Sequence, residues 1–330
     1  MPEHKTYSLR SALWFLFAFS LVVTGATWLV SPLLEPFRRT LLPDAGAAWY
    51  YWKLPKPELW ASVSMWVLYL AHQITVWCLI ARMKNEPRPR TGRIGRANLN
   101  LLVANGVFIL LHLAQSVLFY DALAQFTPVF SSQGSVIVML VMILILLNSR
   151  RGLFFGKRVS LPPLGVSITQ SVHGYYIAWA VVYTFWFHPM ESTLGHLLGF
   201  FYMFLLMGQL SLARTSWHTK IGWITFLEVF VAFHGAVVAI LQGNGMWPMF
   251  FFGFLAMFVV TQLYGIVKNR MAIAGISAGY LILVLPAYGG LFSGLFTGAD
   301  IGWADIHQIT WIPLILYALV FALVWLFALV

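Results

Sequence analysis

The sequence predicts an all-α protein, a polytopic bundle of about ten transmembrane helices with both termini in the cytoplasm. Composition, a series of long apolar runs and the distribution of basic residues all point to this fold class. Of the 330 residues, 60% are hydrophobic, 17% are aromatic and only 9% are charged, and the mean hydropathy is +0.81. A soluble domain carries about a quarter charged residues. A chain this apolar therefore needs lipid as its solvent.

Ten apolar runs follow one another along the chain. Most are long enough to cross a hydrocarbon core of about 30 Å at 1.5 Å per residue of helix. Helices are expected because backbone groups in lipid must form their hydrogen bonds within the segment. The predicted helices cover residues 12–30, 59–82, 98–120, 132–148, 166–188, 195–213, 221–241, 247–267, 271–290 and 308–329.

The basic residues indicate the orientation of these helices. The net charge is +10, and 16 of the 20 Lys and Arg residues fall in segments that share a side with the N-terminus. The other side holds only Arg38, Arg39, Lys53 and Lys56. Such a bias places both termini in the cytoplasm and the excess charge against anionic lipid headgroups. We expect a multi-pass protein of the bacterial cytoplasmic (inner) membrane, with the bilayer as partner and no nucleic acid.

The sequence predicts a single integral membrane domain over residues 1–330, with two notable loops. Segment 31–58 is expected to be an extracytoplasmic interfacial loop, because the run Trp49-Tyr50-Tyr51-Trp52 stands beside lysines and suits the headgroup zone. Segment 83–97 is a basic cytoplasmic loop. The apolar, Gly-rich loop 291–306 is too short to span and is expected to dip back into the protein.

Polar residues inside the membrane are expensive, so they point to function. Glu228 is the one acidic residue placed deep in lipid, and it is a candidate catalytic residue, proton relay or ion ligand. The alternative is a protonated or hydrogen-bonded glutamate that fixes helix packing. His72 and His112 fall on adjacent antiparallel helices and, with Glu228, would form the path of a proton- or ion-coupled transporter. Other polar groups that could line such a path are Gln73, Asn105, Gln115 and Gln209.

A second hypothesis concerns the stretch "FHPMESTLGH", which connects two predicted helices. Two helix reversals return His188, His196 and His234 to the outer side, so we expect these histidines to converge within about 10 Å. Together with Glu191 they would hold a zinc, copper or iron ion in a metal-dependent membrane enzyme. The alternative is a set of unrelated interfacial histidines.

A third hypothesis rests on the segment from His196 to Gly235. Its pattern of apolar helices with a histidine near an end, and the motif His218-Thr219-Lys220-Ile221-Gly222 after Arg214, resembles b-type membrane cytochromes such as the cytochrome b561 group. The resemblance covers two of the ten predicted helices, and that family's haem-binding core has four.

The resemblance implies an oxidoreductase or electron-transfer subunit that binds haem b and works with quinone or other membrane subunits. His196, His218 and His234 would then be candidate axial ligands. His173 is added on geometry, because it lies 15 residues before His188 on one predicted helix, about 22 Å of rise and about 60° of rotation away. The haem, metal and transport hypotheses all remain open at the level of sequence, as does a structural subunit or a lipid-modifying enzyme such as a membrane acyltransferase.

Overall fold

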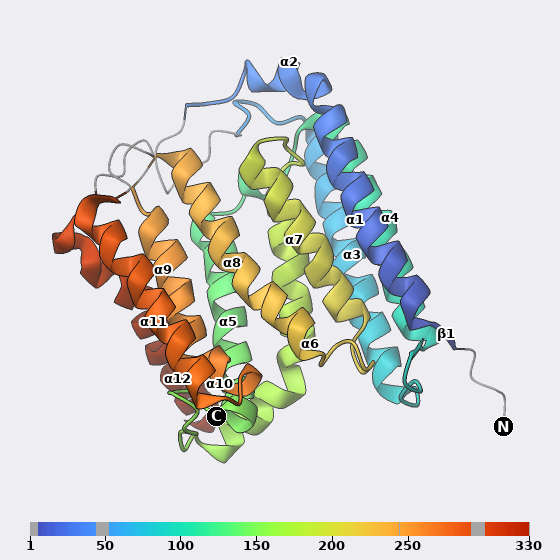
Figure 1. Cartoon of the computed structure of the whole chain (residues 1–330). Helices are drawn as coiled ribbons and strands as arrows, with labels where there is room; N and C mark the ends of the chain where they lie inside the picture. The colour runs from blue at the N-terminus through green and yellow to red at the C-terminus, as the bar shows by residue number, and fades with distance from the viewer. Residues whose placement is uncertain (1–5, 44–52, 244, 292–300, 330) are drawn as a thin grey trace. The chain divides into compact units, whose positions relative to one another are not determined.

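The computed structural model describes residues 6–43, 53–243, 245–291 and 301–329. The fold is an all-α, polytopic helix bundle, as predicted (Figure 1). Within the described residues, strand structure is limited to β1 (Tyr7–Ser8) and β2 (Arg93–Ile94), which pair antiparallel. The aromatic run 49–52 and most of the loop 291–306 lie outside the described residues.

The helices coincide with the ten predicted apolar runs. The α-helices are α1 (Leu9–Leu29), α2 (Glu35–Arg38), α3 (Leu59–Asn85), α4 (Arg96–Phe119), α5 (Val129–Arg151), α6 (Pro163–Phe187), α7 (Leu194–Ser211), α8 (Ile221–Gln242), α9 (Trp247–Met257), α10 (Leu263–Ile266), α11 (Arg270–Pro286) and α12 (Trp311–Leu329). Shorter 3-10 or π segments are η1 (Ser31–Leu34), η2 (Leu123–Gln125), η3 (Phe258–Gln262), η4 (Ala287–Leu291) and η5 (Trp303–Thr310). The segment 31–58 thus begins with η1 and α2, and the basic loop 83–97 is shortened because α3 continues to Asn85.

Nine helical rods in the described part of the chain are long and apolar enough to cross a membrane, which makes this a multi-pass membrane protein. The tenth predicted run is α6. It is long enough at 25 residues, but it is less apolar because tyrosines, tryptophans and polar side chains recur along it. These aromatic side chains turn out to matter for the interior of the bundle.

The chain groups into two compact units, and a single integral membrane domain stays a prediction. The first unit comprises Met1–Val136 and Gly174–Lys220, and the second comprises Ile137–His173 and Ile221–Val330. The chain passes from one unit to the other within α5, within α6 and between α7 and α8. Both units are therefore built from segments that are far apart in the sequence.

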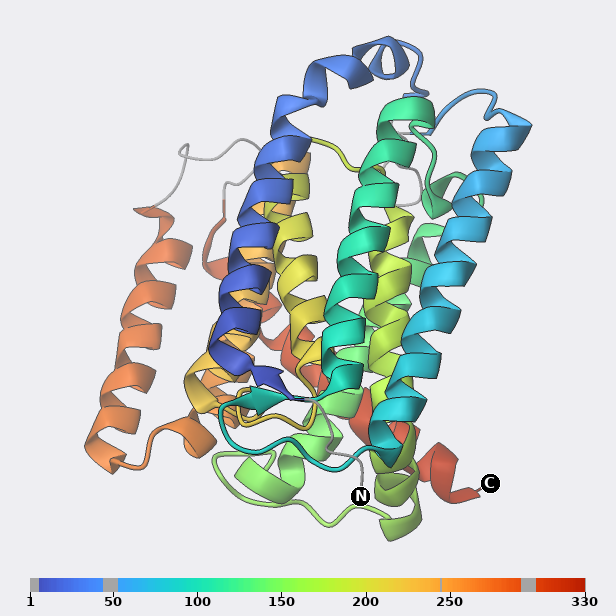
Figure 2. The ribbon, with the colours of Figure 1, turned by 90° about the vertical axis from the view of Figure 1, so that its right-hand side faces the viewer.

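The first unit contains α1, α3, α4, α7 and the second half of α6. Helix α4 packs against α3, α1 and α7, and α1 also packs against α7; Figure 2 shows α1, α4 and α3 side by side. Small residues allow these close contacts. A side chain at Gly208 of α7 would overlap Leu16 of α1, and Gly106 of α4 lies against the ring of Phe19.

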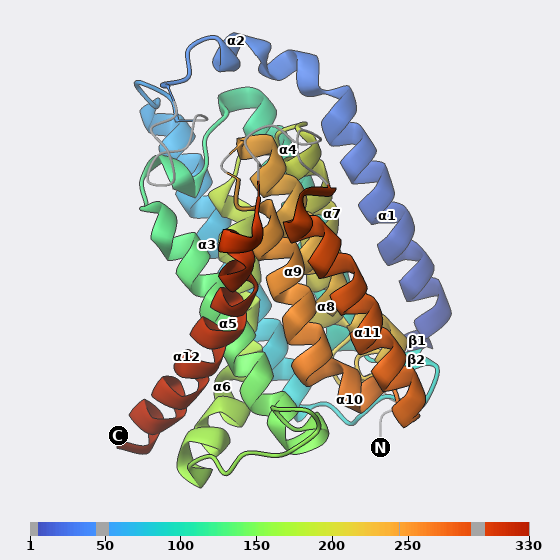
Figure 3. The ribbon, with the colours of Figure 1, turned by 60° about the vertical axis from the view of Figure 1, so that its left-hand side comes forward.

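The second unit is organised around α9, which packs against α8 and α12 (Figure 3). The turn after α5 docks on the π segment η3, where Phe155 donates its backbone N–H to the carbonyl of Val260 at 2.8 Å. The hydroxyl of Thr261 donates to the carbonyl of Leu153 at 2.9 Å and lies 2.6 Å from the hydroxyl of Tyr317. The π turn therefore frees a backbone carbonyl that anchors the connection between α5 and α6.

Candidate functional site

His72 lies at the centre of a buried polar network in the first unit. Its Nδ1 is 3.0 Å from the indole N–H of Trp186, and its Nε2 is 2.8 Å from Oδ1 of Asn105. An indole N–H can only donate, so Nδ1 must accept and Nε2 must carry the proton that it donates to Asn105. The ring also stacks on Phe108, with 4.4 Å between the ring centroids. Both nitrogens of His72 are therefore occupied in one neutral tautomer.

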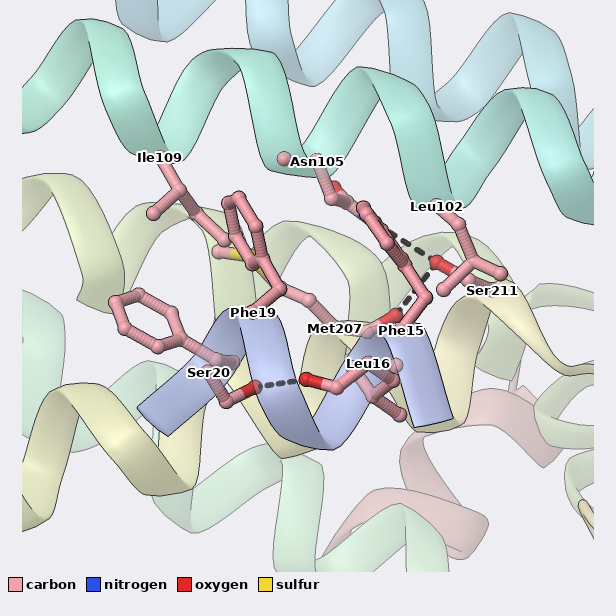
Figure 4. Close-up of a pocket in the computed structure, with 12 residues that line it drawn as sticks. Phe15, Leu16, Phe19, Ser20, Leu102, Asn105, Ile109, Met207 and Ser211 are labelled. Carbon is pink, nitrogen blue, oxygen red and sulfur yellow. Dashed lines mark hydrogen bonds between the residues drawn. The ribbon is translucent and has the colours of Figure 1, made fainter. Parts of the chain in front are cut away.

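The network continues toward the predicted cytoplasmic side through α4 and α7. Asn105 donates through Nδ2 to the hydroxyl of Ser211 at 2.9 Å, and that hydroxyl donates to the carbonyl of Met207 at 2.7 Å. Asn98 donates to the carbonyls of Ser211 and Ala213 at 2.7 and 2.9 Å. Figure 4 shows Asn105 and Ser211 beside a small pocket among α1, α4 and α7. A series of hydrogen bonds thus connects His72 of α3 with Asn105 of α4 and with Ser211 at the end of α7.

His112 extends the network toward the predicted outer side. It is fully buried, and its Nε2 is 2.9 Å from the carbonyl oxygen of His188, which can only accept. Its ring lies against Trp186, with 4.2 Å between the centroids. Its second nitrogen, Nδ1, is buried and makes no hydrogen bond of normal geometry to the described residues, and the backbone of Phe185 also lies near the ring. His112 therefore differs from His72 in having an acceptor that no part of the described chain uses.

Gln73 is a second buried group with unused hydrogen-bonding atoms. It is 3% exposed, and both atoms of its amide lack partners among the described residues. Tyr69 and Trp77 lie one turn away on either side. Their polar atoms contact α6: Tyr69 accepts from the indole of Trp179, and Trp77 donates to the carbonyl of Tyr175. Gln73 therefore faces the second half of α6.

Gln115 is a third such group. It is 3% exposed, and its amide oxygen and nitrogen also lack partners in the described part of the chain. It follows Phe108 by seven residues, which leaves only about 20° of rotation between them on a helix. Because Phe108 stacks on His72 of α3, Gln115 faces α3 as well. It lies one turn beyond His112 on α4.

These side chains form a polar column, which we define as His72, Gln73, Asn105, His112 and Gln115. Buried polar groups are normally hydrogen-bonded, and leaving one unpaired in an apolar interior costs several kcal/mol. Three members of the column have polar atoms without partners among the described residues, so the column is a candidate binding site for a polar molecule or a proton.

An ion pair closes the outer end of the first unit and bears on the predicted metal site. The carboxylate of Glu191 accepts from Arg38 at 2.8 and 2.9 Å, from the hydroxyl of Tyr120 at 3.2 Å and from the N–H of Ser192 at 2.9 Å. The hydrogen bond to Glu191 raises the pKa of Arg38 above its ordinary value. Glu191 is 2% exposed, and its two oxygens already have four donors. This arrangement makes Glu191 part of an ion-paired clamp rather than a ready metal ligand.

His188 and His196 lie close together, with 5.8 Å between their ring centroids. The Nδ1 atoms contact the carbonyl of Thr184 at 3.2 Å and the hydroxyl of Thr193 at 2.8 Å, respectively. Burial lowers the pKa of His188 to about 4. His234 belongs to the second unit, so the convergence of all three histidines stays a prediction. Among the described residues, no group of three or more His, Cys, Asp or Glu side chains is placed to hold a metal ion.

The candidate haem ligands are distributed over both units. His196 and His218 lie at opposite ends of α7, whose 18 residues rise about 27 Å, so these two cannot share one haem. The Nδ1 atom of His218 contacts the carbonyl of Gln209 at 3.0 Å. His173 contacts its own helix through the carbonyl of Gln170 at 2.7 Å. Since His173 and His234 belong to the second unit, haem ligation by any remaining pair stays a prediction.

Glu228 forms an ion pair within the second unit. Its carboxylate lies 3.1 Å from Arg151, and the two side chains are 10% and 8% exposed. Gly265 lies directly against the Arg151 side chain. Glu228 therefore faces protein, and the contact fits the packing alternative, while a catalytic or relay role for Glu228 stays a prediction. The partner was missed because the sequence analysis ended this helix at residue 148, whereas α5 continues to Arg151.

Comparison with known proteins adds no assignment: no protein-family model, curated protein or solved structure matches this chain.

Two residues of the site were not identified from the sequence. Trp186 bridges His72 and His112, but nothing in an aromatic-rich helix distinguishes one tryptophan from the others. Arg38 pairs with Glu191, and here a signal existed. Basic residues are scarce on the outer side, so a carboxylate in an outer loop has few possible partners.

Proposed function

We propose that this protein is a proton-coupled membrane transporter whose proton path follows the polar column of the first unit. The observation that carries this proposal is the set of unpaired buried polar atoms on Gln73, His112 and Gln115. Intramembrane polar groups of this kind mark ion and proton pathways. No residue in the described part of the chain uses this hydrogen-bonding capacity.

The chemistry of the column favours protons over other ions. The buried polar side chains of α3 and α4 are imidazoles, amides and hydroxyls, with no carboxylate or ammonium among those described. A metal cation or an anion would meet no opposite charge there and would be costly to bury. Imidazole is the side chain that takes up and releases a proton near neutral pH. His112 is therefore the member of the column that can take up a transported proton, because both nitrogens of His72 already have partners.

The test is proton flux into proteoliposomes that contain a trapped pH-sensitive dye, with the membrane potential clamped. We expect flux well above that of protein-free liposomes, and a loss of at least about tenfold for His112→Leu, since a missing proton-transfer group commonly costs about 10²–10⁴ in rate. His307→Ala is the matched control, because His307 is exposed in η5. Equal flux for wild type and His112→Leu, with similar yields of folded protein, would rule out the proposed path.

The haem and metal hypotheses stay predictions. In the described residues, His173, His188 and His218 contact backbone carbonyls, His196 contacts the hydroxyl of Thr193, and Glu191 is bound to Arg38.

A further inference from the structure

His112 and Gln115 present three buried hydrogen-bonding atoms without partners in the described chain. These are Nδ1 of His112 and both amide atoms of Gln115. The residues are 0% and 3% exposed and lie one turn apart on α4, where side chains three positions apart are neighbours. Two adjacent and almost completely buried side chains therefore have atoms without hydrogen-bond partners among the described residues, whereas both ring nitrogens of His72 have partners.

The contacts of His112 decide what kind of molecule can bind there. Its Nε2 is committed as a donor, because the carbonyl of His188 can only accept. In the neutral ring, Nδ1 is then an acceptor, and its partner must donate an O–H or N–H. The amide of Gln115 can both donate and accept. A partner that satisfies both residues must therefore combine donor and acceptor capacity.

These requirements select a small neutral hydroxyl compound. An anion such as chloride has no proton to donate to Nδ1. A permanent cation would lack a counter-charge among the described buried side chains of α3 and α4. Water has two donors and two acceptors, and buried waters in proteins typically make about three hydrogen bonds to otherwise unsatisfied groups.

We infer that His112 and Gln115 bind a water molecule inside the first unit, and that this water passes protons to His112. Only the transfer of protons to His112 rests on the proposed function, and the binding of water does not. The water donates to Nδ1 of His112 and is oriented by the amide of Gln115. When the water carries an excess proton, that proton moves along the hydrogen bond to Nδ1. A neutral water and an imidazolium ring remain, and Nε2 keeps its bond to the carbonyl of His188.

Gln115 is a positioning residue in this arrangement, because it acts on the water and not on the proton. Replacing it with methionine, which is similar in length and cannot hydrogen-bond comparably, removes one side of the water site. His72 supplies an internal reference. Its Nδ1 already accepts from Trp186, so it has no place for water.

The experiment is solid-state NMR on protein with ¹⁵N-labelled histidine, reconstituted in lipid bilayers. The His112 signals are assigned by their loss in His112→Phe. We expect magnetisation transfer from water protons to Nδ1 of His112 in the wild type, a reduction of at least about twofold in Gln115→Met, and no transfer to Nδ1 of His72 in either protein. An unchanged His72 signal shows that the variant is folded, and Gln115→Leu serves as a second variant.

The outcomes separate the two proposals. Absence of water transfer to Nδ1 of His112 in the wild type overturns the water site, whatever the proton flux. Transfer that is equal in wild type and in both Gln115 variants overturns the role of Gln115. Water transfer without proton flux keeps the water site and refutes the proposed function. Flux without water transfer keeps the function and refutes the site.

Discussion

Trp186 determines which nitrogen of His72 carries the proton. Because the indole only donates, His72 is held as the tautomer protonated on Nε2, and Asn105 and Ser211 are oriented in turn. His112 contacts the same indole ring but keeps one nitrogen without a partner among the described residues. The two histidines are therefore not equivalent: His72 is fixed by its contacts, whereas His112 is able to bind a guest.

Asp121, in the connection after α4, gives a prediction about pH. One carboxylate oxygen accepts from the N–H of Ala122 at 2.8 Å, the side chain of Ser62 also lies close to the carboxylate, and Asp121 is fully buried. Burial raises the pKa of Asp121 to about 6. The folded state thus binds this proton more tightly than the unfolded state, and the stability gained from protonation is lost as the pH rises through about 6. We expect Asp121→Asn to be more stable than wild type at pH 8, by up to about 3 kcal/mol at 1.36 kcal/mol per pKa unit.

The measurement is thermal unfolding of the purified protein in detergent between pH 4 and pH 8. The advantage of Asp121→Asn should shrink toward pH 4, where the wild-type carboxyl is also neutral. The exposed Glu58→Gln is the control, with an expected effect under about 0.5 kcal/mol. A difference between Asp121→Asn and wild type that does not change with pH would contradict the assignment.

The two halves of helix α6 make different kinds of contact. In the first unit its aromatic side chains Trp179 and Trp186 donate into the interior, to Tyr69 and His72. In the second unit its first turns pack on α12 so closely that Gly165 lies against the backbone of Val324. A helix with these contacts cannot be uniformly aliphatic, which explains why α6 is less apolar than the other spans.

The contact at Gly165 gives a prediction about packing. A methyl group at this position would overlap the carbonyl oxygen of Val324 and lie 2.9 Å from its Cα, and backbone atoms cannot move aside as a side chain can. We expect Gly165→Ala to destabilise the protein by about 1–3 kcal/mol, as overpacking does. Gly174→Ala on the same helix is the control, because nothing lies within 4 Å of the added carbon. That variant should be neutral or more stable by about 0.5–1 kcal/mol. Thermal unfolding of both variants decides this, and equal losses of stability would show that the close contact is not responsible.

The distribution of charge over the whole chain gives a prediction about topology. The ten predicted crossings would return the C-terminus to the side of the N-terminus, and 16 of the 20 basic residues fall in the segments expected on that side. Both termini are therefore expected in the cytoplasm. Green fluorescent protein fused after Val330 should fluoresce, and alkaline phosphatase fused there should be inactive. Alkaline phosphatase fused after Thr127, between α4 and α5, should be active. The opposite pattern would mean an odd number of crossings or an inverted orientation.

The sequence by itself determined the fold class, the approximate bounds of the helices and the candidates for the polar column. Apolar runs long enough to span are local properties of the chain, so composition is sufficient to find them. His72, Gln73, Asn105, His112 and Gln115 were identifiable for a related reason: a polar residue inside an apolar run is conspicuous wherever its helix is placed.

Only the tertiary structure decided which of these groups are paired. Hydrogen bonds depend on helix rotation and on neighbours, and residues such as His72 and Trp186 are 114 positions apart in the chain. The same is true of the ion pairs of Arg38 with Glu191 and of Arg151 with Glu228, whose members are 153 and 77 positions apart. An apolar run specifies that a helix lies in the membrane. The direction in which each side chain points is set by packing between helices, and the unpaired nitrogen of His112 is visible only there.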